Sequence, residues 1–143
     1  MKAEIKILYV EDNEDYIEFV KRAIKKIDIP VVLESVTDGN AAVEYLDNNQ
    51  AIDKRPGLIL LDINLPGITG IELIQKIRKY ENMTLTPVVM FSTSDNPADV
   101  KKSYGYGANA YVIKPMGIEP LANSLKSMYN FWINFNYSKS KYN

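Results

Sequence analysis

The stretch that decides the fold is residues 58–67, which read Leu-Ile-Leu-Leu-Asp-Ile-Asn-Leu-Pro-Gly. Four consecutive aliphatic residues predict a strand that is buried on both faces, as in a parallel sheet. The strand runs directly into Asp62, and the Pro66-Gly67 pair breaks the chain soon afterwards. Asp62 is therefore expected at the carboxyl end of a core strand, which is the edge where open α/β sheets bind ligands.

Strand-like and helix-like segments alternate along the whole chain. Short apolar runs predict further strands at 5–10, 31–36, 87–91 and 110–113. Apolar residues at helical spacing predict helices at 14–27, 38–48, 69–80, 97–106 and 118–135. Five such units predict an α/β fold, a doubly wound five-stranded parallel sheet of the flavodoxin-like kind. Residues 1–136 are expected to form one domain, and 137–143 a polar C-terminal tail.

The composition excludes several classes of function. The chain contains no cysteine and no histidine, which rules out thiolate nucleophiles, histidine-based triads and metal sites built on cysteine or histidine. A net charge of −1 gives no electrostatic case for binding nucleic acid. The sequence shows neither a signal peptide nor an apolar run long enough to span a bilayer, so we expect no membrane contact and a cytoplasmic location.

Polar and charged residues follow four of the five predicted strands. The first strand leads into Glu11 and Asp12, the third into Asp62, the fourth into Ser92 and the fifth into Lys114. Parallel strands bring these residues to one edge of the sheet. Clustered carboxylates need a cation, and oxygen ligands favour Mg²⁺, with Mn²⁺ as a further choice. Lys114 and Ser92 suit a phosphoryl group, and the central Asp62 suits a nucleophile that forms an aspartyl phosphate.

With these residues in place, the chain resembles the receiver domain of two-component response regulators over about residues 5–129. The features that carry the resemblance are the acidic pair Glu11-Asp12, the Asp62 to Gly67 segment, the hydroxyl of Ser92, the aromatic Tyr111 and the Lys114-Pro115 pair. The resemblance implies that a histidine kinase or phosphotransfer protein donates a phosphoryl group to Asp62.

The resemblance also implies a role for each remaining site residue. Glu11, Asp12, Asp62 and the backbone carbonyl of Asn64 would hold the metal ion, and Lys114 would contact the phosphoryl oxygens. Ser92 would move toward the phosphate as the switch hydroxyl, and Tyr111 would turn inward as the switch aromatic. The surface formed by helix 97–106, strand 110–113 and the last helix would change in consequence. The Lys114–Pro115 peptide bond is usually cis in this family.

Three features depart from the common family pattern. The acidic pair is Glu-Asp, which is expected to lengthen metal coordination by a water, and the switch hydroxyl is serine rather than threonine. The loop at 49–57 is longer than in compact receivers. This loop and the aromatic pair Phe131-Trp132 resemble those of stand-alone regulators that work with phytochrome-type kinases. We therefore expect a phosphoacceptor signalling domain without an attached output domain.

Each residue also has an ordinary structural explanation. Asp62 alone is a turn residue, Glu11-Asp12 a helix-capping pair, Ser92 a cap and Lys114 a solvated lysine. Tyr111 alone is a core or surface residue. The aromatic stripe of the last helix is explained either by packing within the chain or by a homodimer interface, and it comprises Leu121, Leu125, Met128, Tyr129, Trp132 and Phe135.

Two other functions remain as alternatives at this point. A phosphatase with an aspartyl-phosphate intermediate would need a second acid two residues after its nucleophile, where this chain has Asn64. A flavodoxin-like cofactor binder would need a glycine-rich loop after the first strand, where this chain has an acidic pair. We therefore expect a signalling domain rather than an enzyme, with slow self-dephosphorylation.

Overall fold

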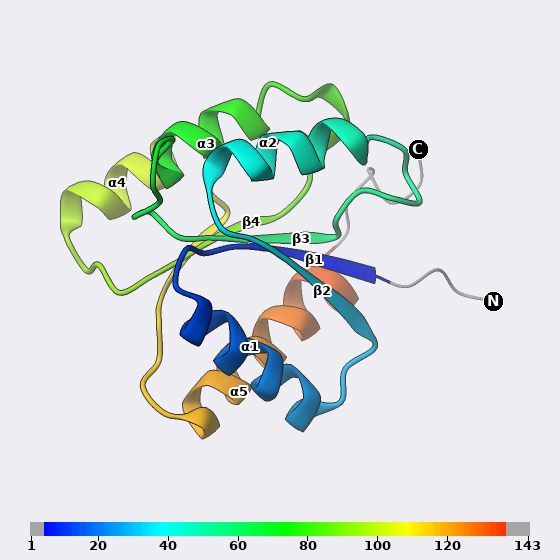
Figure 1. Ribbon diagram of the computed structural model, residues 1–143, viewed down its shortest axis with the longest axis vertical. Helices are drawn as coiled ribbons and strands as arrows, with labels where there is room; N and C mark the ends of the chain where they lie inside the picture. The colour runs from blue at the N-terminus through cyan, green and yellow to red at the C-terminus, as the bar shows by residue number, and fades with distance from the viewer. Residues whose placement is uncertain (1–4, 137–143) are drawn as a thin grey trace.

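A computed structural model describes residues 5–136, and the predicted tail at 137–143 lies outside the described residues. Strands and helices alternate as predicted (Figure 1). The strands are β1 (Ile5–Val10), β2 (Val31–Val36), β3 (Leu58–Leu61), β4 (Val88–Ser92) and β5 (Ala110–Ile113). The helices are α1 (Glu14–Ile27), α2 (Gly39–Asn48), α3 (Gly70–Ile77), α4 (Pro97–Gly105) and α5 (Ile118–Met128). A 3₁₀ turn, η1 (Glu81–Met83), and a π-helix, η2 (Tyr129–Phe135), complete them.

All strands are parallel and lie in the order β2-β1-β3-β4-β5. This order confirms the predicted doubly wound α/β sheet. Strand β3 is central, with Leu61 paired to Val10 of β1 on one side and to Met90 of β4 on the other. The residue that follows β3, Asp62, therefore lies between the ends of two neighbouring strands.

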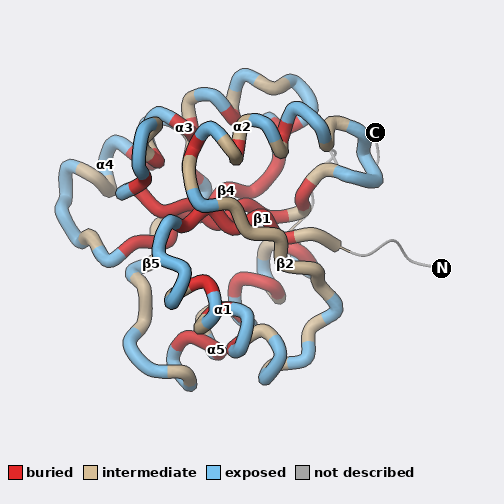
Figure 2. The backbone as a smooth tube through the Cα atoms, viewed as in Figure 1, coloured by how far each residue is buried: buried red, intermediate tan, exposed pale blue. Residues whose placement is uncertain are grey.

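Helices cover both faces of the sheet (Figure 1). Helices α1 and α5 pack on one face, and α2, α3 and α4 lie on the other, with the buried segments concentrated between them (Figure 2). Successive side chains of a strand point to opposite faces. Ile7 and Tyr9 of β1 accordingly belong to the core with α1 and α5, whereas Leu8 and Val10 belong to the core with α2 and α3. The sheet is buried on both faces, as the aliphatic run of β3 predicted.

Local capping and one arginine explain where two helices begin and end. Asn13 is the N-cap of α1, because its side chain accepts a hydrogen bond from the N–H of Tyr16 at 3.1 Å. Helix α3 stops at Ile77, before the predicted residue 80. There the guanidinium of Arg78 donates hydrogen bonds to the carbonyl oxygens of Met83, at 2.9 Å, and Gly107, at 2.8 Å, which hold the following turn against the helix end.

The predicted last helix changes winding along its length. It is an α-helix to Met128 and a π-helix from Tyr129 to Phe135, where the Asn136 N–H donates to the Phe131 carbonyl at 2.7 Å. Most of the predicted aromatic stripe packs into the core beside α1, but Phe135 stays 76% exposed. Packing within the chain thus explains all of the stripe except its last member. None of the helices in the described part of the chain is long and apolar enough to span a bilayer.

Candidate functional site

The predicted site residues come together at the carboxyl edge of the sheet. Backbone hydrogen bonds continue past the strand ends and fix their places. The N–H of Asp62 donates to the carbonyl of Val10 at 3.1 Å, and the N–H of Lys114 donates to the carbonyl of Ser92 at 2.8 Å. The segments that carry Asp62, Ser92 and Lys114 are therefore positioned by the sheet itself and not by flexible loops.

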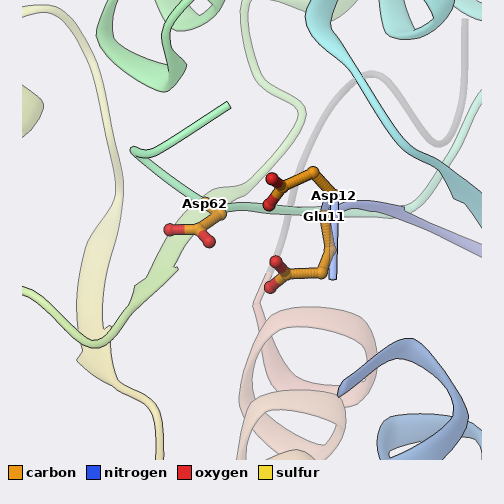
Figure 3. Close-up of side chains that lie close together, drawn as sticks. All are labelled: Glu11, Asp12 and Asp62. Atoms are coloured by element: carbon orange, nitrogen blue, oxygen red, sulfur yellow. The ribbon is translucent and has the colours of Figure 1, made fainter. Parts of the chain in front are cut away.

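Three carboxylates form the centre of this site (Figure 3). One oxygen each of Glu11, Asp12 and Asp62 lies within 4.8 Å of the others. Glu11 and Asp62 are buried, whereas Asp12 is exposed and keeps the cluster open to solvent. Three carboxylates at this separation repel one another unless a cation lies among them. An all-oxygen set of this kind fits a hard divalent ion such as Mg²⁺ or Mn²⁺.

Lys114 supplies the positive charge of the site. Its ammonium group forms ion pairs with Glu11 Oε1 and with Asp62 Oδ2, the latter at 3.0 Å. The same Nζ lies 4.7 Å from the centre of the Tyr16 ring, within the range of a cation–π contact. The lysine side chain is only 7% exposed, so these pairings replace its hydration. Lys114 is thus held beside Oδ2 of Asp62, and the alternative interpretation of Lys114 as a solvated lysine does not hold.

Both carboxylate oxygens of Glu11 accept hydrogen bonds. Besides Lys114, the hydroxyl of Tyr9 donates to Oε1 at 2.9 Å, and the N–H of Asn13 donates to Oε2 at 3.2 Å. Burial raises the pKa of Glu11, the hydrogen bond from Lys114 offsets part of this rise, and the charge of Asp62 adds to it. Burial likewise raises the pKa of Tyr9 far above its usual range.

Sequence reasoning missed Tyr9 altogether. Tyr9 is fully buried and looks like an ordinary core residue of β1. The available signal was its position two residues before Glu11, because side chains two apart along an extended segment point to the same face. The contact places a hydroxyl from the core directly against the acidic cluster.

The predicted switch residues meet in the connection between β4 and α4. Ser92 is fully buried, and its hydroxyl oxygen accepts a hydrogen bond from the N–H of Ser94 at 3.2 Å. Tyr111 is half-buried and donates its hydroxyl hydrogen to the carbonyl of Ser94 at 2.8 Å. The hydroxyl of Ser94 in turn donates to Asp99 of α4 at 2.7 Å. One short loop therefore links Ser92, Tyr111 and the start of α4.

Asn64 and the Lys114–Pro115 peptide bond are the two remaining positions for which the sequence made a prediction. Asn64 is exposed beside the site, and its N–H donates to Asp62 Oδ1 over a long 3.4 Å. The described residues contain no cis peptide bond, so Lys114–Pro115 is trans and differs from the cis form that the family resemblance implies. The carbonyl of Pro115 accepts a hydrogen bond from the Tyr16 hydroxyl at 3.2 Å, which fixes this connection against α1.

Comparison with known sequences gives a consistent set of relatives. The family model of the response regulator receiver domain matches residues 7–126. The probable methanogenesis regulatory protein FilR2 of Methanothrix harundinacea is 32% identical over 92% of this chain and 86% of its own. The response regulator Rcp1 of Synechocystis is 33% identical over 89% of this chain and 88% of its own.

Solved structures agree with these relatives. The phosphorylated cyanobacterial phytochrome response regulator RcpA is similar with a TM-score of 0.84 and 34% identity, covering 94% of this chain and 98% of its own. The Mn²⁺-bound form of Rcp1 is similar with a TM-score of 0.78 and 32% identity, covering 93% and 97%. The likeness therefore extends over nearly the whole fold described above.

Proposed function

The chain belongs to the response regulator receiver domain family, and we propose that Asp62 is the residue on which it accepts a phosphoryl group. The observation that supports this assignment most strongly is the Lys114 ammonium at 3.0 Å from Asp62 Oδ2, with the acidic pair beside it. A carboxylate oxygen in this setting can act as a nucleophile, while the ammonium group neutralises charge that gathers on the phosphoryl oxygens. The chain is thus a signalling domain whose output depends on phosphorylation.

The transfer we propose is a displacement at phosphorus. A carboxylate oxygen of Asp62 forms a bond to the phosphorus of a phosphohistidine on the donor protein. The bond between phosphorus and the imidazole nitrogen breaks, and its electron pair leaves with the imidazole. Lys114 pairs with the phosphoryl oxygens, and Ser92 donates its hydroxyl hydrogen to one of them. Later attack by water on the same phosphorus would break the bond between phosphorus and the Asp62 oxygen, release inorganic phosphate and return Asp62 to its carboxylate form, a slow self-dephosphorylation.

We propose Mg²⁺ as the metal ion, with Mn²⁺ as a substitute. Asp12, Asp62 and the backbone carbonyl of Asn64 would bind it directly, and Glu11 would complete the acidic set through a water. The acidic cluster and its oxygen-only chemistry support a divalent ion here. The structure of Rcp1 with Mn²⁺ supports the same class of ion in a relative. The cation would neutralise negative charge shared by the carboxylates and the phosphoryl group.

We further propose that the signal leaves through the face formed by α4, β5 and α5. Ser92 and Tyr111 are both bonded to the loop at Ser94, so movement of Ser92 toward the phosphoryl group would release or re-form these bonds. Large apolar side chains are exposed on this side, including Tyr104, Tyr106 and Ile113. Partner binding, homodimer formation or onward transfer of the phosphoryl group would follow from the change.

The proposed donor is a histidine kinase or phosphotransfer protein. The likeness to RcpA, a phytochrome response regulator, supports a phytochrome-type kinase. A groove between α1 and the β5–α5 connection is lined by Tyr16, Phe19 and Met116, and also by Pro115, the residue after Lys114. Such a groove suits a helix that carries the phosphohistidine. We propose the cytoplasm as the location, because the ATP that such kinases consume is found there. Residues 1–136 would form the receiver domain.

Acetyl phosphate provides the direct test of Asp62. With Mg²⁺ present, the protein should gain one phosphoryl group, measured by mass spectrometry of the intact chain. Asp62→Asn should abolish the uptake. Asp28→Asn is the matched control, because Asp28 is an exposed residue at the C-terminal end of α1 in a left-handed conformation that asparagine tolerates. Uptake by Asp62→Asn at the rate of the control would refute the assignment.

The alternatives make different predictions. The family match gives no support to a phosphatase, and a phosphatase would turn over small phosphate esters continuously instead of stopping at one phosphoryl group per chain. A flavodoxin-like protein would carry a coloured cofactor through purification. Size-exclusion chromatography with and without acetyl phosphate would test the homodimer, which should appear or strengthen on phosphorylation if the α4-β5-α5 face forms it.

A further inference from the structure

We propose that Tyr9 is a positioning residue of this site, whose buried hydroxyl holds the Glu11 carboxylate as the anchor of Lys114 and away from direct metal ligation. The inference rests on the proposed function, since it concerns the same carboxylates and the same lysine. It assigns a role in the site to a residue of the core that lies beneath the reacting groups.

The ring of Tyr9 has a fixed place. Its side chain is fully buried, and its ring meets that of Phe91 edge to face, with centroids 6.2 Å apart. Phe91 meets Tyr16 in the same way at 6.1 Å. Close packing of this kind leaves the ring few other positions. The hydroxyl group is therefore presented to Glu11 from one direction only.

The hydrogen bonds of Glu11 satisfy a buried carboxylate without a metal ion. Oε1 accepts from the Tyr9 hydroxyl and from the Lys114 ammonium, and Oε2 accepts from the N–H of Asn13. Asp62 differs: within residues 5–136, its Oδ1 accepts only the long 3.4 Å contact from the N–H of Asn64, and its Oδ2 accepts from Lys114. A cation that enters the cluster is thus expected to bind Asp12 and Asp62, while Glu11 remains engaged by its donors.

Removing the Tyr9 hydroxyl should alter two properties in opposite directions. In Tyr9→Phe the ring still fills the core, but Glu11 loses one of its donors and becomes available to the cation. Affinity for Mn²⁺ should rise by about 3- to 10-fold, the range of one hydrogen bond of ordinary net strength, because Lys114 and the N–H of Asn13 still engage the carboxylate. Lys114 loses part of its anchor, so the rate of phosphorylation by acetyl phosphate at saturating Mg²⁺ should fall by about the same factor.

Tyr80→Phe is the matched control. The Tyr80 hydroxyl donates to Asp47 at 2.6 Å, so this variant also removes a hydrogen bond between a tyrosine and a carboxylate, but at a solvent-exposed contact between α2 and the residue that precedes η1. Mn²⁺ affinity can be measured from the electron paramagnetic resonance signal of the free ion, without any phosphoryl donor. The control should match the unmodified protein in both metal affinity and phosphorylation rate.

A double-variant cycle tests whether Tyr9 acts through Glu11. In a Glu11→Gln background, Tyr9→Phe should leave Mn²⁺ affinity unchanged, because the carboxylate it releases is absent. An equal effect in both backgrounds would overturn the proposal. The proposal would also be overturned if Tyr9→Phe had the same metal affinity and phosphorylation rate as Tyr80→Phe. A fall of both properties in Tyr9→Phe would overturn it as well. Absence of phosphoryl uptake by the unmodified protein would refute the proposed function, whereas the Mn²⁺ measurements would still decide the role of Tyr9.

Discussion

Replacing Gly70 by alanine places a methyl group where the backbone of the Asp62 segment already lies. A Cβ atom on Gly70 would lie 2.1 Å from the carbonyl oxygen of Asp62 and 2.7 Å from the Cα of Ile63. Cβ contacts shorter than 3.0 Å hardly occur, so the start of α3 and the segment after β3 must separate by at least 0.9 Å, the difference between 3.0 and 2.1 Å. Both atoms are backbone, and no side-chain rotation relieves the contact.

The displacement should affect both stability and function. Overpacking of this kind costs about 1–3 kcal/mol. For a domain of this size the melting temperature falls by roughly 3–4 °C per kcal/mol. Because the moved segment carries Asp62, the proposed acceptor oxygen shifts relative to Lys114 by a large fraction of an ångström. A misplacement of about 1 Å can slow a positioned reaction by about 100-fold, so phosphorylation should slow far more than the stability change alone requires.

Gly105→Ala provides the control for this substitution. Gly105 is the last residue of α4, and a Cβ there would meet nothing within 4 Å. Alanine at that position should leave phosphorylation unchanged and keep or raise stability, by up to about 1 kcal/mol. Urea unfolding followed by circular dichroism measures the stability, and uptake of phosphoryl from acetyl phosphate measures the phosphorylation. Equal results for Gly70→Ala and Gly105→Ala in both measurements would contradict the predicted displacement.

Two further predictions concern residues other than the proposed acceptor and metal ligands. Arg78→Met should lower the free energy of unfolding by about 2–4 kcal/mol, because the carbonyl of Gly107 and the side chain of Asn109 lose a charged donor; an unchanged urea midpoint would contradict this. Burial raises the pKa of Tyr16, Tyr45 and Tyr80 to about 12 each, from a usual 10.0. The fold therefore favours the neutral phenols, and this stabilisation is complete below pH 10 and is lost as the pH rises through 12. Phenolate absorbance should show these groups ionising late, and a titration complete near pH 10 in the folded protein would argue against it.

The local pattern of the chain was enough to predict the elements of the fold. Apolar runs and helical spacing report directly on which faces are buried, so β1, α1, β2, β3 and β5 have the predicted bounds. The ends of α3 and α5 were predicted less well. Arg78 closes one helix end through carbonyls far along the chain, and the aromatic packing of η2 accompanies a change of winding. Neither contact has a local sequence signal.

The sequence by itself determined which residues reach the carboxyl edge of the sheet. The pair Glu11-Asp12 follows β1, Asp62 follows β3 and Lys114 follows β5, and parallel strands all end at the same edge. Their individual roles in phosphoryl transfer stay predictions, which the variants above test.

Only the tertiary structure decided how these side chains are paired. The order β1-β3-β4-β5 brings Lys114 to both Glu11 and Asp62, although the three residues are far apart in the chain. The same packing turns the buried ring of Tyr9 so that its hydroxyl meets Glu11. A strand pattern predicts the face to which a side chain points. The hydrogen-bond partner of a buried polar group depends instead on which side chains the neighbouring elements place beside it. These partners are therefore determined only when the sheet and its helices have assembled.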